Sequence, residues 1–189
     1  MRLNEPRLPA LQRDEWNDKA AEVMAKIETS GEAFNVYKTM ANVPDLFKRW
    51  VVFATHIMFK NSLSIRDREL LILRIGWLTQ SGYEYSQHVR IALENGFTEA
   101  DIERVKNGSG AEGWDEKEGA LVKAAEELRD DSFISDATWT TLSKHFSTEN
   151  MADIIFTVGN YNMLAMALNS FGVQLDDHLV DYFGQGAKS

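Results

Sequence analysis

Residues 63–96 read LSIRDRELLILRIGWLTQSGYEYSQHVRIALENG. Ser64 is a favourable N-cap for a helix, and Asp67 adds a negative charge to the first turn, where the helix dipole favours it. The helix predicted after this cap, over about residues 65–79, is apolar on nearly every face, which is typical of a helix buried at the centre of a fold. Its apolar side chains are Leu70, Leu71, Ile72, Leu73, Ile75, Trp77 and Leu78.

A second helix is predicted over about residues 83–95, with Gly82 before it and the C-terminal signal Asn95-Gly96 at its end. The remaining chain also favours helices, because residues 45–189 contain no proline. Apolar residues recur at helical spacing in further segments. These lie at about residues 14–28 (ended by Gly31), 34–40, 44–61, 115–130, 136–146, 149–170 and 173–183, and Thr98 caps one more short helix.

No segment shows the strict alternation of a surface strand, so we predict an all-α, single-domain bundle of about eight or nine helices. The 189 residues are enough for one core. Residues 1–13 are predicted to form an extended arm, because Pro6 and Pro9 disfavour helix in the residues before them. Residues 14–183 form the predicted domain, and residues 184–189 are expected to be a frayed tail.

The chain contains no cysteine. This composition excludes disulfides, zinc sites built on thiolates, iron–sulfur clusters and thiol-based redox chemistry. It also fits a reducing environment, and we expect a cytoplasmic protein.

The overall charge is acidic, with 20 Lys and Arg against 29 Asp and Glu and a net charge of −9. Such a chain lacks the basic surface that nucleic-acid binding needs. No stretch approaches about 18 consecutive apolar residues, so we expect no transmembrane helix. Residues 1–16 lack the apolar region of a secretory signal. A small molecule is therefore a more suitable partner than nucleic acid or a membrane.

Residues 60–90 differ from the rest of the chain, because basic side chains outnumber acidic ones there. The basic residues are Lys60, Arg66, Arg68, Arg74 and Arg90, against Asp67, Glu69 and Glu84. This segment could bind an anionic small molecule. The alternative is that these cations pair with acidic neighbours within the protein.

His88 is the histidine whose surroundings indicate chemistry. Glu84 lies four residues before it, on the same face of the predicted helix. Glu69 lies near the start of the preceding helix and reaches His88 only if the two helices cross. A carboxylate beside an imidazole fixes the tautomer of the ring and makes it a suitable proton donor and acceptor. The alternative for Glu84 is structural, since Ser81 and Glu84 also have the spacing of a capping box.

Three parts of the sequence resemble the carboxymuconolactone decarboxylase family, which includes the alkylhydroperoxidase AhpD branch. They are LSIRDREL at residues 63–70, GYEYSQH at residues 82–88, and Ala92 with GFT at residues 96–98. Residues 159–162 and 171–173 resemble the C-terminal part of longer members. The resemblance implies an AhpD-like helical fold and a homo-oligomer, often a trimer or a hexamer.

The two branches of this family imply different chemistry. The peroxidase branch has cysteines four and seven residues before the histidine, where this chain has Glu84 and Ser81. Thiol peroxidase activity is therefore not expected. The decarboxylase branch keeps a glutamate four residues before the histidine, which implies that Glu69, Glu84 and His88 are the catalytic residues.

The resemblance further implies a lyase that needs no metal or organic cofactor. His88 would protonate the carbanion left by decarboxylation of a small anionic substrate, or move a proton in an isomerisation. Arg90 or Arg74 could hold the remaining carboxylate. Trp77, Tyr83 and Tyr85, with Ser81, are the other expected substrate-binding residues. The competing interpretation is a helical oligomer that binds a ligand or partner without chemistry.

Overall fold

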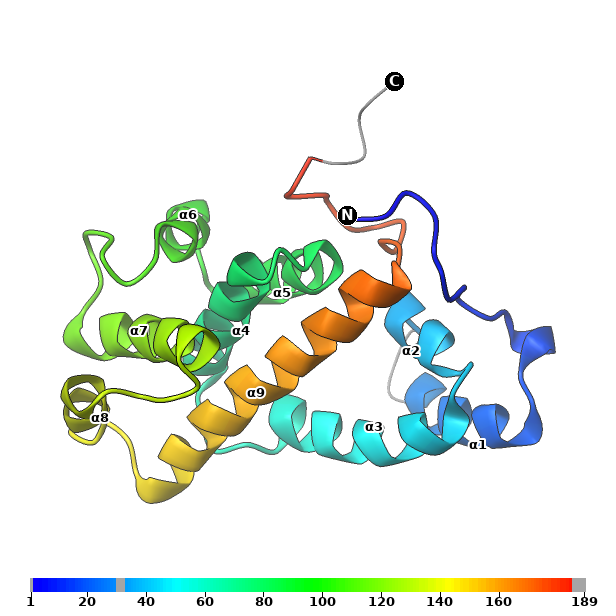
Figure 1. The fold of residues 1–189 in the computed structure, drawn as a ribbon, viewed down its shortest axis with the longest axis horizontal. Coiled ribbons are helices and arrows are strands. Elements are labelled where there is room, and N and C mark those ends of the chain that lie inside the picture. The colour runs from blue at the N-terminus through cyan, green and yellow to red at the C-terminus, as the bar shows by residue number, and fades with distance from the viewer. Residues whose placement is uncertain (1, 30–32, 185–189) are drawn as a thin grey trace.

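The computed structural model describes residues 2–29 and 33–184 (Figure 1). These residues form nine α-helices, no strand, and one 3₁₀ turn at Arg13–Glu15, which confirms the all-α prediction. The helices are α1 (Asp18–Glu28), α2 (Asn35–Met40), α3 (Pro44–Phe59), α4 (Ile65–Leu78), α5 (Gly82–Glu94), α6 (Glu99–Asn107), α7 (Glu116–Asp130), α8 (Asp136–Leu142) and α9 (Thr148–Phe171). Figure 1 shows α1 and α2 at one end of the molecule and α6 to α8 at the other.

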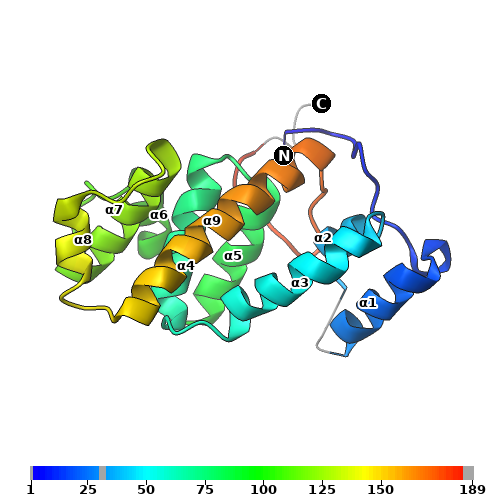
Figure 2. The same cartoon turned by 60° about the horizontal axis from the view of Figure 1, so that its bottom comes forward.

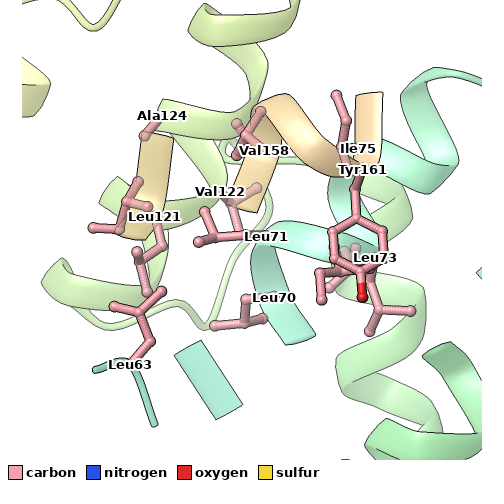
Figure 3. Close-up of a cluster of buried hydrophobic side chains, with 14 of the residues drawn as sticks. Leu63, Leu70, Leu71, Leu73, Ile75, Leu121, Val122, Ala124, Val158 and Tyr161 are labelled. Carbon is pink, nitrogen blue, oxygen red and sulfur yellow. The ribbon is translucent and has the colours of Figure 1, made fainter. Parts of the chain in front are cut away.

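Helix α4 lies at the centre, as its apolar sequence predicts. The Ser64 side chain accepts a hydrogen bond from the backbone N–H of Asp67 at 3.1 Å, which confirms the predicted N-cap. Apolar side chains of α4 are fully buried against α5, α7 and α9. Figure 3 shows three of them, Leu70, Leu71 and Leu73, among side chains of α7 and α9. Burial of each such side chain stabilises the fold by about 1.5–3 kcal/mol.

Helix α9 crosses the bundle next to α4 (Figures 1 and 2). It begins at the Ser147 cap and ends at Gly172, which has a left-handed backbone conformation. Within the described residues, α9 alone has the length and apolar composition of a membrane-crossing helix. Half of its apolar window is buried, and it contacts α3, α4, α5 and α7, so we assign it as a core helix.

Helices α1, α2 and α3 form a second, smaller apolar cluster beside the main bundle (Figure 2). Met24 of α1, Met40 of α2 and Phe47 of α3 are buried in it. Pro44 occupies the first turn of α3, where its missing N–H has no helical partner to lose. Because α3 also contacts α9, this cluster is held against the main bundle along one side.

The structure differs from the predicted elements at both ends of the chain. The predicted helix over residues 173–183 is wrong, because residues 173–184 contain no helix. Gly172 ends α9, and the chain after it makes tertiary hydrogen bonds in place of helical ones. The helix predicted from residue 14 begins at Asp18, after Asn17 caps it. Gly31, and residues 185–189 of the expected tail, lie outside the described residues.

Candidate functional site

A cavity of about 600 Å³ lies between the α1–α3 cluster and the main bundle. Residues of α2, α3, α5 and α9 line it. Its walls are largely aromatic and aliphatic, and the aromatic members include Tyr37, Trp50, Tyr83 and Tyr161. His88, Glu84, Gln87 and Asn160 are among the polar side chains that reach it. An apolar cavity with a few converging polar groups is the usual form of a small-molecule site.

Glu69 and His88 meet at this cavity, although 19 positions separate them in the chain. Nδ1 of His88 lies 2.7 Å from Oε2 of Glu69, and both side chains are buried. Oε1 of Glu69 accepts hydrogen bonds from Nε and Nη2 of Arg68 at 3.0 and 2.8 Å. Arg68 also donates to the carbonyl of Met58 at the end of α3. Both oxygens of Glu69 are therefore occupied, and the imidazole is fixed in one orientation.

The pKa of Glu69 indicates which residue donates the hydrogen bond between Glu69 and His88. Burial acts to raise the pKa of Glu69, but His88 and Arg68 together hold that pKa below its ordinary value. Glu69 is therefore ionised and can only accept, so Nδ1 of His88 donates to it. The other ring nitrogen, Nε2, is left for a ligand. The Tyr161 ring packs edge-on against the imidazole at 4.8 Å between centroids, which further restricts its rotation.

Glu84 lies on the same face of α5 as His88 but makes no hydrogen bond to it. Among the described residues, neither carboxyl oxygen of Glu84 has a hydrogen-bond partner. The capping-box interpretation is wrong, because Ser81 makes no cap and its hydroxyl also has no partner there. Burial raises the pKa of Glu84 well above its ordinary value. Burial therefore favours the protonated form of this carboxyl.

Glu84 is expected to make the protein less stable as the pH rises. In the unfolded chain this carboxyl ionises at its ordinary pKa, whereas the folded protein retains the proton to a higher pH. As the pH rises from the pKa of Glu84 in the unfolded chain to its pKa in the folded protein, the free energy of unfolding should therefore fall. The expected slope is up to about 1.4 kcal/mol per pH unit. Urea unfolding at a series of pH values above the ordinary carboxyl pKa measures this slope, and Glu84→Gln should flatten it.

Glu116→Gln is the matched control for this measurement. Lys144 and His145 lower the pKa of Glu116, an exposed carboxylate that pairs with both. Its replacement should leave the slope in this pH range unchanged. A Glu84→Gln protein with the slope of the wild type would show that Glu84 is ionised in the folded state.

Two of the predicted substrate-binding residues lie at the cavity. The Tyr83 hydroxyl donates to Oδ2 of Asp176 at 2.6 Å and accepts from the backbone N–H of Val36 at 3.2 Å. Arg90 lies at the rim and pairs with Glu94 at 2.9 Å. Of the two predicted substrate-binding cations, Arg90 reaches the cavity and Arg74 does not, and Arg90 already has an anionic partner. Arg68 also lines the cavity and is paired with Glu69.

The other predicted substrate-binding residues lie elsewhere. Arg74 is held by Glu126 and by the carbonyls of Val105 and Lys106, and it does not line this cavity. Trp77 and Tyr85 pack with Tyr182 and Phe183 in a separate aromatic cluster. Ser81 is fully buried and does not line the cavity. The reason is helical geometry, since Tyr85 points about 100° away from Glu84 around α5.

Three residues that contribute to the site were not predicted as site residues from the sequence. Arg68 was considered only as part of the local positive charge, although it adjoins Glu69 in the sequence. Tyr161 and Asn160 come from α9, far along the chain, and Asn160 accepts a hydrogen bond from Trp50 at 3.3 Å. The resemblance of residues 159–162 to longer family members was the only sequence signal for these two.

Asp176 connects three parts of the chain at the edge of the cavity. Its Oδ1 accepts from the backbone N–H of Asn35 at the start of α2. Its Oδ2 accepts from Tyr83 and, at 2.9 Å, from Nε2 of Gln87, both on α5. The segment after α9 therefore fixes the relative position of α2 and α5, which form two walls of the cavity.

A family model for the carboxymuconolactone decarboxylase family matches residues 44–127. Over these residues the chain is similar to the carboxymuconolactone decarboxylase family. The matched segment runs from the start of α3 almost to the end of α7, and it contains Glu69, Glu84 and His88. Asn160 and Tyr161 lie after it, so the cavity is completed by residues beyond the matched segment. No curated protein matches the chain.

Solved structures share the fold of this protein. A peroxidase-related protein from Silicibacter sp. TM1040 has a TM-score of 0.76 at 17% identity, with 93% of this chain and 95% of that chain covered. The alkylhydroperoxidase AhpD core protein from Ralstonia eutropha JMP134 has a TM-score of 0.75 at 20% identity, with coverages of 91% and 93%. A cysteine variant of the debrominase Bmp8 in complex with 2,3,4-tribromopyrrole has a TM-score of 0.75 at 15% identity, with coverages of 92% and 94%. These similarities confirm the AhpD-like fold.

Proposed function

We propose that this protein is a cofactor-independent enzyme that decarboxylates, or isomerises by proton transfer, a small carboxylated substrate. The observation that carries the proposal is the Glu69–His88 pair. One nitrogen of a buried imidazole is held at 2.7 Å by an ionised carboxylate, and the ring lines an aromatic cavity of about 600 Å³. This is the arrangement that general acid–base catalysis by histidine requires.

Decarboxylation at this site would proceed as follows. The bond between the carboxylate carbon and its neighbour breaks, CO₂ leaves, and the electron pair remains on the substrate as an enolate. His88 transfers the proton on Nε2 to the carbon, and Glu69 stabilises the imidazolium before that transfer. The imidazole then regains a proton from water. In an isomerisation, the same nitrogen removes a proton from one carbon and returns it to another.

The residues that line the cavity indicate the class of substrate. Aromatic and aliphatic side chains suit a ring or an unsaturated carbon skeleton. Arg90 at the rim is the cation available to attract a carboxylate, in competition with Glu94. The chain offers no thiolate, so the peroxidase and debrominase names of its structural neighbours are not transferred to it.

Release of CO₂ from carboxylated lactones tests this function. The wild type should release CO₂ faster than the uncatalysed reaction, and Ala54→Phe should abolish most of this activity by filling part of the cavity. Binding of a lactone with no release of CO₂ and no isomerised product would favour the non-catalytic binding protein. Equal rates for wild type and Ala54→Phe would place the reaction outside this cavity.

A homo-oligomer is the second part of the proposal, and the outer faces of α3 and α9 support it. Large apolar side chains are exposed there, with Phe53 and Phe156 in edge-on contact at 6.1 Å. The other exposed members are Val52, Phe59, Ile155, Met163 and Met166. Exposed large apolar side chains on two helices that contact each other favour an interaction site there. Light scattering after size exclusion should give a mass that is a multiple of 21.5 kDa, and Phe156→Glu should shift this mass towards that of the monomer.

We also propose that the enzyme is cytoplasmic.

A further inference from the structure

The cavity has two chemically different sides. The acidic, basic and histidine side chains that line it all come from α4 and α5, and they are Arg68, Glu84, His88, Arg90 and Glu94. The lining side chains of α2, α3 and α9 include no such group, and they are mostly aromatic or aliphatic. A ligand group that lies against α2, α3 and α9 is therefore expected to be neutral, because nothing on that side would compensate a buried charge.

The cavity also extends well beyond His88. Helix α3 lines it from Trp50 to Phe59, a stretch of roughly 13 Å along the helix axis. The end near Met58 is the end of His88, because the Tyr161 hydroxyl lies 3.4 Å from Sδ of Met58 and the Tyr161 ring packs on the imidazole. Trp50 is about two helical turns away. A single small ring beside His88 would therefore not reach the end at Trp50.

Asn160 of α9 offers an unused donor at the Trp50 end. The residue is 5% exposed, and its Oδ1 accepts a hydrogen bond from Nε1 of Trp50 at 3.3 Å. Because an indole nitrogen can only donate, this bond fixes which atom of the Asn160 amide is the oxygen. The amide nitrogen Nδ2 has no partner among the described residues, and it is not one of the fully enclosed polar atoms. It therefore remains accessible from the cavity, where a ligand acceptor can bind it.

Tyr37 of α2 adds an aromatic wall at the same end. The Phe47 ring contacts both Tyr37, at 6.1 Å between centroids, and Trp50, at 6.3 Å, so these two cavity-lining rings lie close together. Burial raises the pKa of Tyr37. Its hydroxyl therefore stays protonated near neutral pH and keeps its ability to donate a hydrogen bond.

We propose that the end of the cavity between Trp50 and Asn160 is a second binding subsite, which takes a neutral aromatic group with an oxygen acceptor, such as an aryl carbonyl. The ring lies among Tyr37, Trp50 and Leu164, and the oxygen accepts from Nδ2 of Asn160. The whole ligand is then longer than one ring, with its reacting group at His88 and its second group in this subsite. The inference rests on the proposed function only for the group at His88, since binding to the subsite needs no turnover.

Acetophenone and ethylbenzene test the hydrogen bond. They share a ring and nearly the same shape, but only acetophenone has an acceptor. In an NMR titration, Asn160→Leu should bind acetophenone about 2- to 10-fold more weakly than the wild type, the usual effect of losing one neutral hydrogen bond. Ethylbenzene should bind to this variant at least as tightly as to the wild type. Equal losses for both probes, or no binding of acetophenone to the wild type, would overturn the inference.

Asn162→Leu is the matched control. Asn162 lies two positions later on the same helix and does not line the cavity, so the affinity for neither probe should change. The position of the probe is measured on the wild type, which covers the case of an Asn160→Leu protein that does not fold. The indole N–H signal of Trp50, identified by its loss in Trp50→Phe, should shift when acetophenone binds. An unchanged Trp50 signal at saturation would overturn the inference.

His88→Ala separates this inference from the proposed function. Acetophenone should bind to this variant as it does to the wild type, whereas release of CO₂ from carboxylated lactones should be lost. A wild type that binds acetophenone at Trp50 but turns over no lactone would contradict the proposed function and leave the subsite supported. A wild type that turns over lactones, with equal losses for both probes in Asn160→Leu, would contradict the subsite alone.

Discussion

Replacing His88 by alanine is expected to lower kcat for decarboxylation by about 10²–10⁴-fold, the usual contribution of a general acid or base. His88 is the one described histidine that lines the cavity, and Glu69 fixes its Nδ1 at 2.7 Å. Alanine removes both ring nitrogens, so no group remains at that position to give a proton to carbon. His88→Gln should lose as much activity, because its amide can bond to Glu69 but cannot transfer a proton.

The control for this variant is His145→Ala. His145 also pairs with a glutamate, at 3.1 Å from Glu116, but this pair lies on the surface away from the cavity. Steady-state kinetics with both variants compare the loss of a histidine at the cavity with the loss of a histidine on the surface. Unchanged turnover in His88→Ala would remove this residue from the mechanism and favour a binding protein without chemistry.

The second large effect is expected on stability, from Glu69→Gln. Glu69 is fully buried and neutralises Arg68, which is also buried. Glutamine has nearly the same shape but no charge, so the Arg68 cation is left in the core without an anion. Removing one partner of a buried ion pair costs about 3–5 kcal/mol, and urea unfolding should show a loss of this size.

The neighbouring pair provides the comparison for this variant. Arg66 bonds to Glu118 at 2.6 Å, but its side chain is about one-third exposed, so Glu118→Gln should cost only about 0–1 kcal/mol. The double variant Arg68→Met/Glu69→Leu leaves neither charge of this ion pair buried and should recover much of the loss of Glu69→Gln. A loss in Glu69→Gln no larger than that in Glu118→Gln would show that water reaches the Arg68–Glu69 pair.

The helices were predictable because their signals are local. Ser64 caps α4 within four residues, Pro44 begins α3, and the apolar run after Ser64 requires a central position for α4. The error at residues 173–183 has a non-local cause. The side chain of Asp176 binds α2 and α5, and contacts with residues more than 80 positions away leave no trace in local spacing.

The site was less predictable than the fold, for a geometric reason. Spacing placed Glu84 and His88 on one face, but only the crossing of α4 and α5 determines that Glu69 reaches His88. The resemblance to family members supplied that partner. Arg74 and Tyr85 were misplaced because composition shows that a residue is basic or aromatic but not which side of its helix it occupies.

The contacts of Asp176 have a consequence for how sequence changes can alter this cavity. The groups assigned to proton transfer, Glu69 and His88, stand on α4 and α5. The walls opposite them depend on α2 and on a segment after α9 that Asp176 ties together. Because Tyr83 and Gln87 stand on the same helix as His88, the late segment holds both the cavity wall at α2 and the helix that carries the imidazole. A change at Asp176 is therefore expected to alter the shape of the cavity and the position of His88 together.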